Sequence, residues 1–173
     1  MKKIFSFLIV AFTASKLNAQ QIPATGSCQV NNTMSAYHGT WQWVNGTDTV
    51  RFYLAQKKVY ININGGYHKD LLIGWHIYKR GNAVIESSYP NINIVNKKIF
   101  LGSNVDEPPG VATGTLKDLS KNKCCELSLT LDPTNTQMTW KSERTPGIRL
   151  RVSGDPQHQP GFTLPENTVL IKQ

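Results

Sequence analysis

Hydrophobic and polar residues alternate with a period of two along most of the chain beyond residue 36. In the run 49–54, Val50, Phe52 and Leu54 fall on one face, whereas Arg51 and Tyr53 fall on the other. The run 71–78 repeats the pattern over a longer stretch. Because successive side chains of a strand point to opposite faces, this period predicts strands with one buried face. No convincing amphipathic helix interrupts them.

Clusters of Asn, Gly, Pro and Asp separate the alternating runs at roughly 8 to 12 residue spacing, which is typical of a β-sandwich or β-barrel. The strands we expect span residues 37–44, 49–54, 59–63, 71–78, 83–88, 91–95, 98–102, 112–119, 124–131, 136–142, 148–152 and 169–171. We expect Lys57-Lys58 to interrupt the pattern, and Asn45-Gly46 to form a type I′ hairpin turn. Residues 106–110 and 153–165 carry the prolines of two loops.

Sequential short strands joined by tight turns favour an all-β antiparallel up-and-down meander. Closing such a sheet removes its exposed edges, so we expect a barrel of about 8 to 10 strands rather than an open sheet. No repeated or low-complexity segment suggests a second domain.

The first 19 residues have the composition of a secretory signal peptide. Lys2 and Lys3 precede the apolar run 4–12, and a small residue, Ala19, stands at the expected cleavage point. We therefore expect a signal peptide over 1–19, an irregular lead-in over 20–36 and one barrel domain over 37–173. No later stretch is long and apolar enough to span a bilayer, so we expect a periplasmic or extracellular protein without stable membrane insertion.

Removal of the first 19 residues changes the charge balance. The remaining 16 basic and 11 acidic residues give a net charge of +5, against +8 for the whole chain. The cations are scattered along the chain, whereas nucleic-acid binding needs a clustered basic stripe with stacking aromatics. We expect no nucleic-acid partner.

Gly39-Thr40-Trp41, at the start of the first strand, resembles the Gly-x-Trp signature of lipocalins and lipocalin-like exported bacterial domains. The resemblance covers about the first two strands. It implies an eight-stranded barrel in which Trp41 plugs the closed end under a cation from the last strands, with Arg149, Arg151 and Lys172 as the candidates. It also implies an apolar or amphipathic small ligand at the barrel mouth.

Large aromatic residues recur on the apolar faces of the expected strands. They either line a ligand cavity or fill a solid core, since aromatics bury roughly 150 to 250 Å² each and are ordinary core material. The residues we consider as ligand lining are Trp43, Phe52, Trp75 and Trp140.

Three cysteines would meet an oxidising compartment after export. Cys124 and Cys125 are adjacent on one strand and point to opposite faces, so they are not expected to bond each other. Cys28 in the lead-in is expected to form a disulfide with Cys124, or alternatively with Cys125 if the lead-in plugs the barrel end.

No motif of a catalytic, metal or cofactor site occurs. His68 and His76 lie eight residues apart, roughly 20 Å or more along a strand, and cannot share a metal there. Ser120 and Lys123 have the Ser-x-x-Lys spacing of some acyl enzymes, but they fall in an expected turn. We therefore assign no catalytic residue, metal or cofactor, and lean away from an enzyme.

Two functions remain open. The first is a non-catalytic exported domain that holds a small apolar ligand in its barrel. The second is an envelope or surface module whose loops 106–110 and 153–165 contact protein or glycan. Exposed aromatics grouped on one outer face would favour it, and a filled interior would fit it.

Overall fold

The computed structural model describes residues 23–104, 110–143 and 161–173. Short 3-10 helices in these ranges are η1 Asn32–Tyr37, η2 Tyr89–Asn91 and η3 Val95–Lys97. The strands are β1 Cys28–Gln29, β2 Gly39–Asn45, β3 Asp48–Ile61, β4 Tyr67–Arg80, β5 Ala83–Ser87, β6 Phe100–Asn104, β7 Val111–Asp118, β8 Lys123–Leu131, β9 Gln137–Glu143 and β10 Thr168–Lys172.

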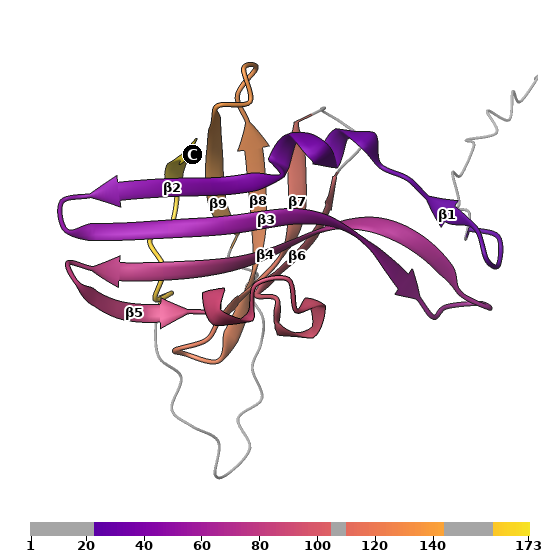
Figure 1. The fold of residues 1–173 in the computed structure, drawn as a ribbon, viewed down its shortest axis with the longest axis horizontal. Coiled ribbons are helices and arrows are strands. Elements are labelled where there is room, and N and C mark those ends of the chain that lie inside the picture. Colours follow the sequence, from indigo (N-terminus) through magenta and orange to yellow (C-terminus); the bar gives the residue numbers. More distant parts are fainter. Residues whose placement is uncertain (1–22, 105–109, 144–160) are drawn as a thin grey trace, which may run out of the picture.

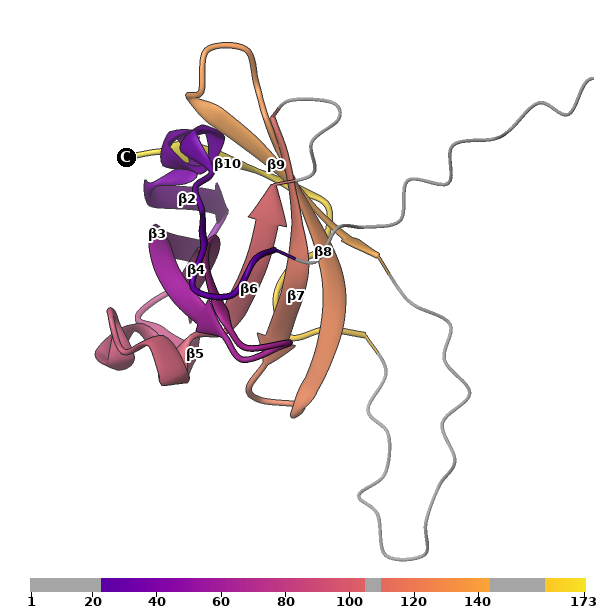
Figure 2. The same cartoon turned by 90° about the vertical axis from the view of Figure 1, so that its right-hand side faces the viewer.

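Eight of the strands form a closed antiparallel barrel in the order β2-β3-β4-β6-β7-β8-β9-β10 (Figures 1 and 2). The ring closes where β10 pairs with β2, with Lys172 opposite Trp41. Closure leaves no long unpaired edge in the ring, which is the reason the sequence favoured a barrel. The prediction of an all-β meander closed into a barrel is confirmed.

Strand β4 connects the ring to the two remaining strands. One edge of β4 pairs with β3 over its whole length, and the other edge is shared by β1 near His68, β6 near Gly74 and β5 near Tyr78. The β3–β4 hairpin extends beyond the rest of the barrel and carries β1 on its side (Figure 1).

The antiparallel order gives the barrel two distinct ends. The η1 end is covered by η1, which leads directly into β2. The β5 end contains the β2–β3, β4–β5 and β7–β8 turns, together with β5 itself.

Several expected elements differ from the structure. The first hairpin turns at Gly46 and Thr47 rather than at Asn45-Gly46, and of these two only Gly46 has positive φ, which is the pattern of a type II′ turn. Strand β3 continues through Lys57 and Lys58 without interruption, because β4 pairs with it throughout. The strand expected at 91–95 is replaced by η2 and η3. The strand expected at 148–152 lies outside the described residues.

Strand β4 is buried on both faces. His76 and Tyr78 point into the barrel, opposite Phe52 and Val50 of β3. Trp75 and its outer-face neighbours Ile73 and Leu71 are also buried, although they are not part of the barrel's core cluster. The segment 88–98 with η2 and η3 lies against β4 and explains why the strand reads as a nearly continuous apolar run.

Candidate functional site

Aromatic side chains from opposite parts of the ring meet inside the barrel. Phe52 on β3 and Trp140 on β9 have ring centroids 4.9 Å apart, although β2 and β10 separate these strands in the ring. Phe100 lies across Gly102 and Gly114, where a Cβ would come within 3.0 Å of its ring. These contacts place protein side chains at the position that a barrel ligand would occupy.

The four aromatics considered as ligand lining do not form one group. Phe52 and Trp140 are almost fully buried in the core cluster, and Trp43 is half-buried and packs against it. Trp75 is on the outer side of the barrel wall, because it alternates with the inward-facing His76. The structure therefore brings three of these residues together and places Trp75 under the segment 88–98.

Trp41 closes the η1 end. Its indole Nε1 donates to the Tyr37 backbone oxygen over 2.8 Å, and it is fully buried. Lys172 Nζ lies 5.1 Å from the Trp41 ring centroid and donates to the Ala36 backbone oxygen. Among the three cations considered for this role, Lys172 holds this position, whereas Arg149 and Arg151 lie outside the described residues.

A buried polar cluster joins the strands at the β5 end. His76 Nε2 lies 3.0 Å from Glu86 Oε1, and His76 Nδ1 lies 3.2 Å from Ser88 Oγ. Glu86 also accepts hydrogen bonds from the backbone N–H groups of Leu119 and Ser120 and from the Ser120 hydroxyl. One carboxylate thereby ties β5 to the β7–β8 turn.

The protonation of Glu86 is set by two opposing influences. Burial raises its pKa, while the contact with His76 and the hydrogen bonds from Ser120 and the Leu119 N–H lower it; the outcome is a pKa of about 2 instead of 4.5. Glu86 is therefore ionised at neutral pH.

The Ser88, His76 and Glu86 side chains have the composition of a hydrolytic triad, but their environment opposes that chemistry. His76 is fully buried and Ser88 is 2% exposed, so a substrate has no access to the hydroxyl. Ser88 Oγ also accepts the His76 backbone N–H over 2.8 Å. The cluster is a structural fastening between β4, β5 and the β7–β8 turn.

Asp118 fastens a second segment to the β5 end. Its carboxylate accepts the backbone N–H groups of Thr163 and Lys121 and the Thr163 hydroxyl. Next to Thr163, Leu164 is 1% exposed and belongs to the core cluster, and Phe162 packs against that cluster. This segment fills the β5 end from within.

Little in the sequence points to the hydrogen bonds of Glu86 and Asp118. Period-two alternation correctly places His76 on the face opposite to Trp75, but Glu86 is on a weak strand and its partners are far away in the chain. Asp118 stands at the end of a strand, where acidic residues usually meet solvent.

The expected disulfide is not present, and this prediction is wrong. Cys28, Cys124 and Cys125 are all free thiols. Cys28 is on β1, which pairs with β4, whereas Cys124 and Cys125 are on β8, separated from β4 in the ring by β6 and β7. Burial raises the pKa of Cys125 to about 12, so very little of this thiol is in the reactive thiolate form at neutral pH.

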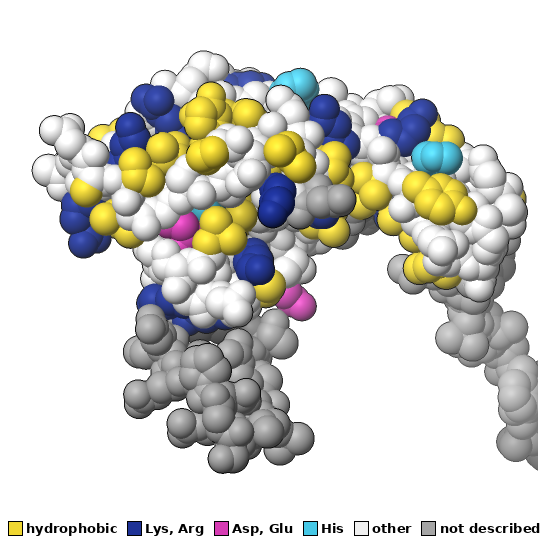
Figure 3. All heavy atoms as spheres, turned by 60° about the horizontal axis from the view of Figure 1, so that its bottom comes forward, with side chains coloured by type: hydrophobic (Ala, Val, Ile, Leu, Met, Phe, Trp, Pro, Cys, Tyr) yellow, Lys and Arg dark blue, Asp and Glu magenta, His cyan; other side chains and the backbone are white. Residues whose placement is uncertain are grey.

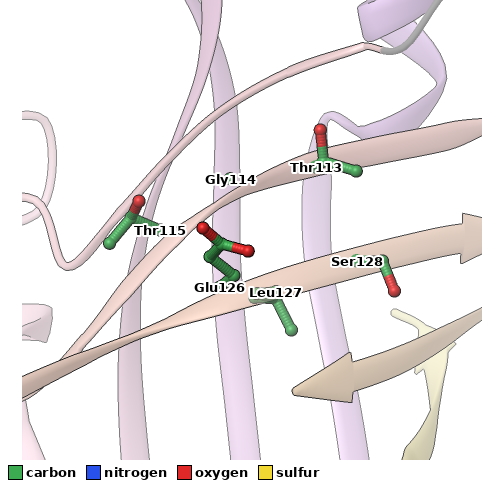
Figure 4. Close-up of a pocket in the computed structure, with 6 residues that line it drawn as sticks. All are labelled: Thr113, Gly114, Thr115, Glu126, Leu127 and Ser128. Carbon is green, nitrogen blue, oxygen red and sulfur yellow. The ribbon is translucent and has the colours of Figure 1, made fainter. Parts of the chain in front are cut away.

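An open hollow of about 400 Å³ lies on the barrel wall at β7 and β8 (Figure 4). It is lined by Thr113, Gly114, Thr115, Glu126, Leu127 and Ser128. Glu126 is the single titratable residue of this lining, so the hollow has no acid–base pair. In the part of the chain that the structure describes, no three His, Cys, Asp or Glu side chains gather to hold a metal. Helices in the same part are too short to cross a membrane.

A protein-family model matches the chain. The model of a family of unknown function (DUF6705) matches residues 1–173, the whole chain. The chain belongs to this family. No curated protein and no solved structure matches it significantly. The family description names no activity.

Proposed function

We propose that this chain is an exported, non-catalytic binding module of the cell envelope or cell surface, with a solid barrel that serves as a rigid scaffold. The observation that carries the proposal is the contact between Phe52 and Trp140 inside the barrel. Lipid-binding barrels need an open lumen of several hundred Å³. Here the lumen is occupied by the protein's own aromatic rings.

The closures at the two ends support the same function. Trp41 and Lys172 cover one end, and the Phe162–Leu164 segment fills the other. A filled interior is what we expect of a surface module. Tyr53 and Tyr89 stack at 4.3 Å on the outside of the wall, which adds an aromatic group to the outer surface.

A ligand-binding assay tests this proposal. The processed protein is titrated with a fluorescent fatty acid, and organic extracts of the purified protein are analysed by mass spectrometry. We expect no saturable binding and no stoichiometric apolar molecule. A one-to-one lipid in the extract would contradict the proposal.

A cavity variant supplies the positive control. Trp140→Ala removes the ring that meets Phe52, and apolar cavities of this kind accept small apolar probes. We expect the variant to bind benzene-sized probes that the wild type does not bind. Circular dichroism shows whether the variant retains its strands.

A further inference from the structure

Strand β5 continues the sheet at one edge of β4, and the segment that follows it, 88–98, lies over the outer face of β4. Together they form an outer layer that exposes aliphatic side chains to solvent. Ser88 and Ile99 anchor this layer to β4, because their N–H groups donate to the backbone oxygens of His76 and Gly74. The layer already buries Trp75 on its inner side. Its exposed apolar side chains are Val84, Ile85, Tyr89 and Ile94.

Cations surround these apolar side chains. Lys79 is directly opposite Val84 in the β4–β5 pairing, and Arg51 contacts Tyr53, which stacks on Tyr89. Lys97 and Lys98 follow Ile94 by one helical turn. Figure 3 shows this face with yellow and dark blue side chains interleaved and little magenta. We call it the β5 face, made of segment 83–98 together with Arg51, Tyr53 and Lys79.

The carboxylates of this part of the chain do not balance its cations. Residues 48–104 contain eight Lys and Arg but three acidic residues. Asp70 and Glu86 are buried, and Asp48 pairs with Arg80 at 3.0 Å. Lys57, Lys58 and Lys69 lie on the far part of the β3–β4 hairpin, so the cations that remain beside the exposed apolar side chains are Arg51, Lys79, Lys97 and Lys98.

We propose that the β5 face binds the surface of an anionic lipid membrane. Aliphatic side chains within a ring of cations match such a surface, since the apolar groups enter the boundary of the acyl chains while the cations meet the headgroup phosphates. This inference rests on the proposed function, because it names the partner of the outer surface. Binding is peripheral, without a membrane-spanning segment.

Other anionic partners fit the β5 face less well. Single-stranded nucleic acid binds through aromatic rings on which bases stack. On this face the Tyr89 ring is already stacked on Tyr53, and the other exposed apolar groups are aliphatic. The chemistry therefore favours lipid.

Vesicle flotation tests the inference with the processed protein. We expect binding to vesicles of phosphatidylglycerol and phosphatidylcholine, at least tenfold weaker binding to pure phosphatidylcholine, and weakening by salt. Each cation near an anionic surface contributes about fivefold to affinity. The double variant Lys79→Glu/Lys97→Glu should therefore lose at least twentyfold, because reversal also adds repulsion.

Matched variants elsewhere on the surface serve as controls. Lys117→Glu/Lys141→Glu makes the same charge change on β7 and β9, and should weaken binding less than threefold. Ile94→Asp should weaken binding strongly, whereas Val169→Asp on β10 should not; the two residues are 50% and 45% exposed. All variants are prepared with the same N-terminus as the wild type. Each should have the same urea concentration at the midpoint of unfolding as the wild type.

Three results would overturn the inference. The first is an absence of binding to anionic vesicles, and the second is an equal loss of binding in the β5-face and control variants. The third is a dimer in sedimentation that Ile94→Asp dissociates, which would make a second copy the occupant. None of these results depends on the barrel lumen. If the β5 face does not bind membranes, the proposal of a solid barrel still stands or falls by the lipid-extraction test.

Discussion

A tryptophan closes the η1 end of the barrel, whereas at the β5 end two carboxylates hold in place the segment and the turn that close it. Trp41 is held by one indole hydrogen bond and by the cation of Lys172, and otherwise by apolar packing. Glu86 and Asp118 instead accept hydrogen bonds from backbone N–H groups of the β7–β8 turn and of Thr163. The same barrel is thus sealed in two chemically different ways.

Because of this difference, the two ends are expected to respond differently to pH. Apolar packing around Trp41 does not depend on a titrating group. A buried carboxylate that accepts several hydrogen bonds stabilises the fold only while it is ionised. The β5 end is therefore expected to open first in acid, while the η1 end remains packed.

The largest effect is expected from Trp41→Ala. Removing a fully buried tryptophan leaves a cavity and should lower the free energy of unfolding by about 3 to 5 kcal/mol. Urea denaturation at pH 7 and again near pH 4 measures the loss. We expect the same loss at both values, and a loss that shrinks strongly in acid would contradict the distinction between the ends.

The next largest effect is expected from Glu86→Gln. The folded protein holds the pKa of Glu86 at about 2, below its ordinary 4.5, so its ionised form contributes stability above pH 4.5. That contribution, about 3 kcal/mol, is lost as the pH falls from 4.5 towards 2. The variant should lose about 2 to 4 kcal/mol at pH 7.

Stability curves against pH compare the two proteins directly. The wild-type curve should fall between pH 4.5 and 2 more steeply than that of Glu86→Gln, so the two should converge in acid. Glu126→Gln is a control, because Glu126 is an exposed carboxylate on the outer wall of β8. Parallel curves for wild type and Glu86→Gln would show that this carboxylate does not fasten the β5 end.

The sequence predicted the η1 end much better than the β5 end. The Gly39-Thr40-Trp41 motif is local, so three adjacent residues were enough to place Trp41 and to name Lys172 among its partners. Glu86 instead meets Leu119 and Ser120, more than thirty residues away. Contacts of this kind depend on which residues are paired between neighbouring strands of the barrel, and no local sequence pattern specifies that pairing.

The same limit explains why Trp75 was expected to line the lumen and why a disulfide was expected that the structure does not contain. Period two separated the two faces of β4, but it does not say which face points inward when both are apolar. Cysteine spacing likewise carries no information on which strands are neighbours. The closed meander was predictable because it needs only strand order and short turns.

A smaller effect is expected from Lys172→Met. The substitution keeps much of the side chain's length but removes the cation above Trp41 and its bond to the Ala36 oxygen. We expect a loss of about 1 kcal/mol in urea denaturation. A loss equal to that of Trp41→Ala would mean that the cation, rather than the packing, closes the η1 end.

The smallest effect on stability is expected from reduction of the protein. Because all three cysteines are free, dithiothreitol should leave the melting temperature unchanged.

Thiol labelling compares the opening of the two ends of the barrel. A disulfide reagent at pH 7 should label the exposed Cys28 and Cys124 rapidly and the inward-facing Cys125 slowly. In Glu86→Gln, labelling of Cys125 should accelerate at least tenfold, because that residue is next to the β7–β8 turn that Glu86 holds. Equal acceleration of Cys125 labelling in Lys172→Met would show that the two ends open together.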